Sequence, residues 1–498
     1  MANRITIPKA HLITALCLPL AIFLGYMLAE PMESGSIAVV TLVLIVLAVP
    51  LMMKWHHPVL VLCWNAAVYP AILPGRPQIW ILATAVAFFF ALLNRSVNSS
   101  HRFVSVPVLT RPLLFFGLVV LATAFLNGGI GIRSLGGGTL GGRGYLMLLG
   151  AIAGYFAFTS QRIPLHLVWL YVGMFFLSTL TAVVGDLAYF AGPSFYFLTA
   201  FFVPSNVAVY DTAYARFGQI SIAAAGLLAW LLARYGIKEL FNVRRPWLAA
   251  LFILCGIGAV VGGFRSAVGV FTLTFLVIFT LEGLWRTRIL GLVLGTAILV
   301  GIALIPQVDK LPFMVQRSLS FLPIHVDPIA RQSAEASTKW RMEMWQEVIP
   351  DIPKYLWKGK GYRLDPNELF MSQFAVMNGF DIQARSTLVS GDYHSGPLSV
   401  IIPLGLPGVI AFAWLLVAGL RTLYQHYQSG DPSLKQLNTF LFGFFIVKIL
   451  VFLFLFGSLY NDLFSFTGLL GFSVSLNGAP EKRVVVEEAE EAFSEEFA

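Results

Sequence analysis

Long apolar runs alternate with short polar connections along most of this chain. Many runs approach or reach the roughly 20 residues that an α-helix needs to cross a bilayer. They are continuously apolar, whereas the strands of an outer-membrane barrel alternate in polarity. The pattern predicts membrane helices over residues 11–30, 36–53, 58–73, 78–93, 112–126, 145–160, 165–189, 218–235, 247–263, 266–284, 288–306, 395–420, 436–457 and 461–478. We therefore expect an all-α fold, a polytopic transmembrane helical bundle of about 12–14 helices.

One long polar segment, residues 307–394, interrupts the apolar pattern. Residues 1–306 hold the predicted helices before it, and residues 395–478 hold the C-terminal ones. Inside the segment, Thr338–Val348 carries apolar and aromatic residues at helical spacing, with Ser337 or Thr338 as a cap and Pro350 as a stop. We expect this amphipathic helix to rest on the membrane interface or on the bundle. The acidic residues 479–498 are predicted to form a disordered cytoplasmic tail.

Composition and charge agree with a membrane protein and add an orientation. Hydrophobic residues make up 58% of the chain and charged residues 12%, with a mean hydropathy of +0.79, whereas soluble domains carry about 25% charged residues. The net charge of +8 does not indicate nucleic-acid binding, because Lys and Arg cluster between apolar runs. With a cytoplasmic N-terminus, the short outer loops hold only Arg76, Arg133, Arg143, Arg216 and Arg265. The positive-inside rule then predicts cytoplasmic termini and an outer location for residues 307–394.

The cysteines and histidines indicate neither disulfides nor a metal site. Cys17, Cys63 and Cys255 all lie inside apolar runs, so no disulfide framework is expected. No second His or Cys stands at ligand spacing from His394, which argues against a metal site. The first apolar run, residues 11–30, is long for the core of a signal peptide and is predicted to be retained.

Four residues of the predicted outer face are candidates for chemistry. Arg216 begins a helix, Arg265 lies between two helices with almost no loop, Arg341 lies on the amphipathic helix, and His394 opens an apolar run beside Asp392. A cation between membrane helices is costly without a partner or a function, and histidine is the commonest general base. The alternatives are arginines that snorkel to the headgroup level, an ion pair of Arg341 with a neighbouring glutamate, and an interfacial histidine without a role.

Three further features are weaker. Lys448 is a charge inside the predicted helix 436–457, where it can pair with Asp462 or line a cavity. Asp186, near the outer end of its helix, is a candidate of the same kind. The glycine-rich stretch Gly128–Gly144 lacks the GlyLysSer/Thr ending of a phosphate loop and is predicted to lie outside the cytoplasm, so we interpret it as a flexible loop.

The order of these motifs resembles the O-antigen ligase and O-antigen polymerase superfamily of bacterial envelope enzymes. An arginine at an outer helix start precedes Gly-x-Arg-Ser-Ala, a long outer loop with Arg-x-x-x-Trp, a Gly-x-Gly and a histidine that opens the next helix. The closest stretches are Phe264–Gly269, Trp340–Pro350, Gly359–Tyr362 and His394–Val409, within residues 210–420. The family commonly has His-Asn at the histidine, where this chain has His394 followed by serine.

The resemblance implies a glycosyltransferase of the bacterial inner membrane. Such an enzyme moves glycan from a polyprenyl diphosphate, at the periplasmic face, to a glycan, lipid A core or protein acceptor. Arg216, Arg265 and Arg341 would bind the diphosphate leaving group, because arginine forks stabilise charge that develops on oxygen. His394 would act as general base on the acceptor hydroxyl. Arg265 and Arg341 would be the other two catalytic residues. The family implies no cofactor, no metal and no nucleic-acid partner, and it leaves open ligase or polymerase activity and a chain-length regulator.

A lipid-linked glycan flippase or transporter is the alternative function. Transporters place polar groups near the midplane, often at broken helices in repeated halves. Here the cations gather at one face, no halves repeat, and Lys448 is the clearest midplane charge. A scaffold for envelope assembly or signalling is a further alternative. The enzyme hypothesis predicts that Arg265, Arg341 and His394 converge on one outward-facing cavity beneath the polar segment.

Overall fold

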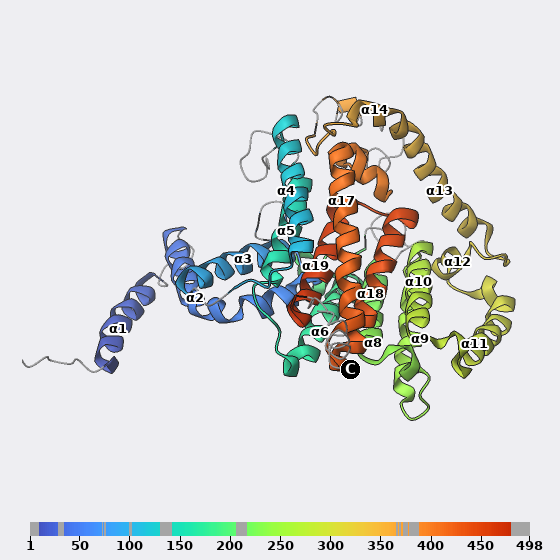
Figure 1. Cartoon of the computed structure of the whole chain (residues 1–498), viewed down its shortest axis with the longest axis horizontal. Coiled ribbons are helices and arrows are strands. Elements are labelled where there is room, and N and C mark those ends of the chain that lie inside the picture. The colour runs from blue at the N-terminus through green and yellow to red at the C-terminus, as the bar shows by residue number, and fades with distance from the viewer. Residues whose placement is uncertain are drawn as a thin grey trace, which may run out of the picture. The chain divides into compact units, whose positions relative to one another are not determined.

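The fold is that of a computed structural model (Figure 1). The structure describes residues 9–27, 34–71, 73, 76–98, 102–129, 142–205, 217–364, 367, 370–371, 377 and 388–479. The chain divides into two compact units, residues 1–56 and 57–498. The first unit contains α1 (Lys9–Met27) and most of α2 (Ser34–Trp64).

The regular elements in the described residues are helices, and most of them are apolar. In the second unit they follow as α3 (Ile79–Val97), α4 (Pro107–Asn127), α5 (Arg143–Phe158), η2 (Leu165–Leu167), α6 (Val168–Leu177), η3 (Ser178–Thr181), α7 (Ala182–Ala191), η4 (Pro193–Ala200), α8 (Gly218–Leu240), α9 (Pro246–Val261), α10 (Arg265–Leu281), η7 (Leu284–Arg286), α11 (Arg288–Leu304), η8 (Ile305–Lys310), α12 (Phe313–Leu319), α13 (Pro328–Val348), η9 (Ile349–Asp351), α14 (Ile352–Tyr355), α17 (Gly396–Ser429), η10 (Pro432–Leu434), α18 (Lys435–Leu450), η11 (Val451–Leu455) and α19 (Leu459–Asn477). Within the described part of the chain, eight helical stretches are long and apolar enough to cross a membrane, and α5, α9 and α10 are shorter apolar helices. The predicted class, a polytopic helical membrane protein, is confirmed.

The prediction of separate helices over residues 36–53 and 58–73 is wrong. The first of them and residues 58–64 of the second lie on the continuous helix α2, which ends at Trp64, and residues 66–70 are not helical. The polar residues between the two predicted helices looked like a loop, but their side chains find partners inside the structure. His56 Nδ1 lies 3.1 Å from the carbonyl oxygen of Met52, one turn back on the helix. His57 Nε2 lies 2.9 Å from the carbonyl oxygen of Phe158, so neither imidazole requires the helix to end.

The predicted helix 165–189 is a chain of shorter pieces. Two α-helices, α6 and α7, flank the 3₁₀ turn η3, which carries three hydroxyl side chains. Ser178, Thr179 and Thr181 each donate to a carbonyl oxygen three residues earlier, at 2.7–3.2 Å. Such side-chain bonds compete with the regular helix ladder. Thr181 also accepts a hydrogen bond from the amide of Ala67 at 2.9 Å, so the break anchors the non-helical stretch that follows α2.

An aromatic cluster between α5, α6 and α19 belongs to the hydrophobic core of the second unit. Phe175 stacks on Phe472 with ring centroids 4.4 Å apart, and Phe158 lies edge-on to them at 6.0 and 6.4 Å. A Cβ at Gly471 would come within 2.8 Å of the Phe158 side chain. Helices in a membrane associate largely through such close packing, because lipid tails are as apolar as the side chains. The glycine therefore lets α19 lie side by side with α5.

The long helix α17 is broken at Gly405, and the break holds the polar segment. Gly405 has φ of +64°, which strains a residue with a side chain, and Pro407 has no amide hydrogen for the ladder. The carbonyl oxygens of Ile402 and Pro403 accept the amides of Lys360 and Gly361 at 2.8 and 2.9 Å. The motif Gly359–Tyr362 thus lies against the kink of α17, and these hydrogen bonds hold the part of the polar segment that directly follows α14.

Candidate active site

A cavity of about 680 Å³ lies between the start of α10, the middle of α13 and the residues before α17. Its lining includes three of the four predicted site residues, Arg265, Arg341 and His394. These three side chains come from distant parts of the sequence, and the structure brings them together. The fourth, Arg216, lies outside the described residues, as does most of the glycine-rich stretch 128–144.

A tight turn between α9 and α10 positions Arg265. Gly263 has φ of +73°, in the left-handed region that favours glycine. A Cβ at Gly262 would clash with the Ser221 side chain of α8, so the turn is pressed against that helix. Arg265 Nη2 donates to the carbonyl oxygen of Ala334 at 2.6 Å and to Thr338 Oγ1 at 2.8 Å. Among the described residues, the hydrogen bonds of Arg265 all use Nη2, which leaves Nη1 and Nε for a ligand.

The helix that carries Arg341 is longer than predicted. It begins at Pro328, where the Asp327 side chain accepts a hydrogen bond from the amide of Ile329 at 2.7 Å. Neither Ser337 nor Thr338 is the cap, because Asp327 already satisfies the first turn ten residues earlier. The helix ends at Val348, before Pro350, as predicted. It belongs to the part of the chain between α11 and α17 (Figure 1).

Arg341 lies in a half-buried position with little to neutralise it. Its Cζ lies 5.8 Å from the ring centroid of Phe456, and its buried Nε has no hydrogen-bond partner in the described part of the chain. Burial lowers the pKa of Arg341, the nearby Arg265 lowers it further, and Asp392 opposes both. A guanidinium that is both desolvated and repelled by another cation favours an anionic ligand.

His394 is held in a strained and enclosed position at the start of α17. Its φ is +48°, which is uncommon for a residue with a side chain and is typical of functional sites. The ring packs between Trp340 and Phe456, with centroid distances of 5.1 and 4.8 Å. Trp345 Nε1 donates to the carbonyl oxygen of Tyr393 at 2.8 Å. This bond ties α13 to the backbone next to the histidine.

The electrostatics of His394 favour the neutral imidazole. Burial lowers its pKa below the ordinary value of 6.5, Asp392 raises it, and Arg341 lowers it. Nδ1 lies 3.8 Å from Asp392 Oδ1, and the backbone amide donates to the same oxygen at 3.3 Å. At 3.8 Å the carboxylate forms no hydrogen bond with the ring, and Nδ1 is buried without a hydrogen-bond partner among the described residues. The ring stays neutral near pH 7 and can accept a proton.

Arg317 is a lining residue that the sequence analysis did not single out. Its side chain is 3% exposed. Its Nε donates to Ser333 Oγ at 3.1 Å, and its Nη1 donates to the carbonyl oxygen of Gly263. A cation in a polar segment is usually solvated, so the sequence does not predict Arg317 as a site residue. The available signal was its position on one helical face with Met314 and Ser318, which are also buried.

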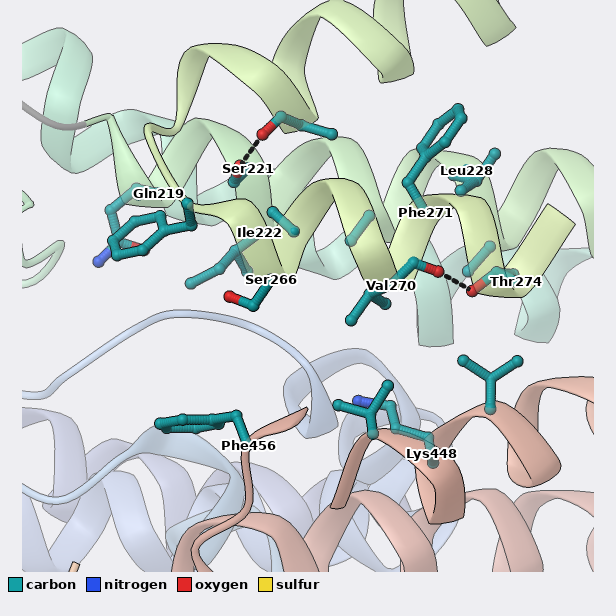
Figure 2. Close-up of a pocket in the computed structure, with 18 of the residues that line it drawn as sticks. Gln219, Ser221, Ile222, Leu228, Ser266, Val270, Phe271, Thr274, Lys448 and Phe456 are labelled. Carbon is teal, nitrogen blue, oxygen red and sulfur yellow. Dashed lines mark hydrogen bonds between the residues drawn. The ribbon is translucent and has the colours of Figure 1, made fainter. Parts of the chain in front are cut away.

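A second cavity, of about 670 Å³, adjoins the first and is mostly apolar. Figure 2 shows it with α8 and α10 on one side and Lys448 and Phe456 on the other. Phe456 and Ser266 line both cavities. Lys448 Nζ lies 5.5 Å from the ring centroid of Phe444, and the ion pairs formed among the described residues do not include it. Of the two predicted alternatives, Lys448 lines a cavity, and its charge also interacts with that of Asp462 without a close ion pair.

The other weak candidates have structural partners. Asp186 is buried and accepts hydrogen bonds from the amide and the hydroxyl of Ser205, at 2.7 and 3.0 Å. Asp462 accepts one from the amide of Ser458 at 2.7 Å, ahead of α19. The described residues contain no group of three His, Cys, Asp or Glu that could hold a metal ion.

The fold and the cavity define a multi-pass helical membrane protein that gathers arginines and a neutral histidine beneath a polar segment. Residues 249–413 match the family model described as O-antigen ligase. The match confirms the resemblance predicted from the motifs, and the chain carries a domain of the O-antigen ligase and polymerase superfamily. The matched residues include Arg265, Arg317, Arg341 and His394. A comparison with curated proteins gives no match.

The family match gives the general class of activity. The chain is a multi-pass bacterial membrane enzyme of the O-antigen ligase type, a glycosyltransferase in the broad sense. This family implies a lipid-linked glycan substrate and a membrane setting.

Proposed function

We propose that this protein is an inner-membrane glycosyltransferase that transfers or polymerises polyprenyl-diphosphate-linked glycan at the periplasmic face. The observation that carries the proposal is the shared cavity of Arg265, Arg341 and His394. Two cations and a proton acceptor around one space suit a reaction in which a diphosphate leaves and an alcohol attacks. Cytoplasmic termini and an outer polar segment follow from the distribution of Lys and Arg.

The proposed reaction is a displacement at the anomeric carbon of the donor glycan. The acceptor hydroxyl forms a bond to that carbon while the bond to the diphosphate oxygen breaks. His394 takes the hydroxyl proton, and the diphosphate leaves with the electron pair. Arg341 and the free nitrogens of Arg265 neutralise the charge that develops on the leaving oxygens. Arg216 is proposed as a further ligand of the diphosphate.

The apolar cavity in Figure 2 suits the lipid part of the donor. It opens from the same residues that line the arginine–histidine cavity, Phe456 and Ser266 among them. A donor with its diphosphate at Arg341 can therefore extend its first isoprenoid units between α8, α10 and α18. The acceptor, whether glycan, lipid A core or protein, approaches from the side of His394.

The experiment that tests this function uses a deletion strain complemented with wild type, Arg265→Lys or the matched control Arg286→Lys. Lysine keeps the charge but cannot copy the arginine fork, and hydrogen bonds to charged groups contribute about 1.5–3 kcal/mol. We expect Arg265→Lys to lower glycan output about tenfold to a hundredfold. Arg286 is exposed and lies outside both cavities, so its variant should match wild type.

Surface polysaccharide and lipid-linked precursor are read from the same cells at equal membrane levels. Single repeat units that accumulate on the outer face indicate a polymerase, and long lipid-linked chains there indicate a ligase. Precursor that accumulates on the inner face instead favours the flippase alternative. Full glycan output from Arg265→Lys contradicts the proposed diphosphate contact.

Asp392→Asn is expected to shift the acid limb of the pH profile of kcat/KM to lower pH. The Asp392 charge raises the pKa of His394 against the effect of burial, so its removal leaves histidine neutral at lower pH. Asparagine keeps an oxygen that can accept the amide of His394. The measurement is kcat/KM with a lipid-linked donor across the acid range. Asp351→Asn, on the exposed turn η9, is the control, and an identical profile for Asp392→Asn contradicts the assignment of His394 as the titrating base.

A further inference from the structure

A third cavity, of about 820 Å³, lies at the ends of α3 and α5 and the start of α4. Two arginines line it, Arg95 near the end of α3 and Arg102 in the linker to α4. Both side chains are exposed, and the ion pairs formed among the described residues include neither of them. Thr110 adds a hydroxyl. The lining contains no carboxylate that could neutralise the two cations.

A hydrogen bond and a cation–ring contact hold the walls of this cavity. The amide of Val104 donates to the carbonyl oxygen of Thr159 at 2.7 Å, which ties the linker to the end of α5. The guanidinium of Arg95 lies 5.7 Å from the ring centroid of Phe103. These contacts hold Arg95, and the linker that carries Arg102, beside one space, whereas arginines that only orient a membrane protein need no shared cavity.

The rest of the lining is apolar and follows the helices into the membrane. Leu92 of α3 and Leu114 of α4 are exposed, and Phe156 of α5 is half-buried. A cationic rim beside an apolar wall matches a phospholipid, whose phosphate lies at the membrane surface and whose acyl chains lie below it. Basic pockets between membrane helices bind anionic headgroups in this way. A free phosphate ion would use the arginines and leave the apolar wall exposed.

We propose that this cavity binds an anionic phospholipid, with Arg95 and Arg102 on the phosphate and Leu92, Leu114 and Phe156 against the acyl chains. The site is separate from the candidate active site. Tyr145, near the start of α5, accepts the amide of Tyr362 from the polar segment at 3.0 Å, whereas Thr159 follows the other end of α5. At 1.5 Å of rise per residue, these ends are about 20 Å apart, so this cavity and the polar segment lie at opposite ends of α5.

The test uses the full-length protein, purified and delipidated in detergent. Binding of phosphatidylglycerol, phosphatidylcholine and inorganic phosphate is measured by native mass spectrometry and by the thermal unfolding midpoint. We expect wild type to retain phosphatidylglycerol in preference to phosphatidylcholine. The double variant Arg95→Gln/Arg102→Gln should lose at least tenfold in affinity. Arg111→Gln removes a charge next to Thr110 but outside the cavity lining, so it should bind as wild type does.

Thr110→Glu is a second variant, because the arginines also help to orient the protein in the membrane. It keeps both arginines and adds a negative charge at the cavity, so it should weaken phosphatidylglycerol binding to a similar extent. Equal loss in Arg111→Gln would mean diffuse surface charge and would overturn the proposal. Binding of inorganic phosphate as strong as that of phosphatidylglycerol, or no preference over phosphatidylcholine, would overturn it too. None of these readouts depends on glycan transfer.

Discussion

Replacement of His394 by alanine is expected to lower the rate of glycan transfer by about 10²–10⁴-fold, the range typical of a lost general base. The side chain lies between Trp340 and Phe456 in the cavity that it shares with Arg341. Its burial keeps the imidazole neutral near pH 7. Alanine leaves the acceptor hydroxyl with no group to take its proton, while the arginines still bind the donor. The expected phenotype is loss of surface glycan with accumulation of lipid-linked precursor.

The measurement compares His394→Ala with His325→Ala at matched membrane levels. His325 belongs to the same polar segment but is exposed and lies outside the cavity lining, so its variant should retain wild-type output. In purified enzyme, His394→Ala should lower kcat with little change in the affinity for donor. Wild-type output from His394→Ala would make the histidine an interfacial bystander, and the transporter and scaffold alternatives would gain support.

Replacement of Arg341 by alanine is the second large effect, expected to lower kcat about 10²–10³-fold, as loss of one donor to a developing oxyanion does. Arg341 is half-buried, and its Nε lacks a hydrogen-bond partner among the described residues. A partly buried cation without an ion pair is costly, and a diphosphate would neutralise it. The effect should therefore appear in the step where negative charge develops on the leaving oxygen.

Arg341→Lys separates charge from geometry. Lysine restores a cation but not the bidentate fork, so it should recover only part of the lost rate. Arg331→Lys is the control on the same helix, because Arg331 is exposed and its Nη2 donates to the carbonyl oxygen of Ile324. If Arg341→Ala turns over donor at the wild-type rate, Arg341 is only a solvated charge at the membrane surface, and the leaving-group proposal loses its central cation.

Local sequence patterns predicted the structure correctly where the physical cause of that structure was itself local. Long apolar runs are incompatible with water and compatible with lipid whatever they pack against, so the class of fold was readable from the chain. The end of α13 at Val348 was readable because Pro350 interrupts a helix by its own chemistry. The predicted start of the same helix was wrong, because several polar residues in this stretch can act as a cap. The backbone conformation of the folded chain makes Asp327 the cap. Helix α2 was split for a similar reason, since the partner of His57 is the distant carbonyl of Phe158.

The sequence by itself determined the membrane class, the polar segment and the family motifs with their candidate arginines and histidine. Tertiary structure alone decided that Arg265, Arg341 and His394 line one cavity and that the buried Arg317 joins them. It also decided that Asp186 has a structural partner while Lys448 faces an apolar cavity. The physical reason is that burial and neighbouring charge depend on which distant segments meet. Apolar spacing and turn residues record only what each segment does alone.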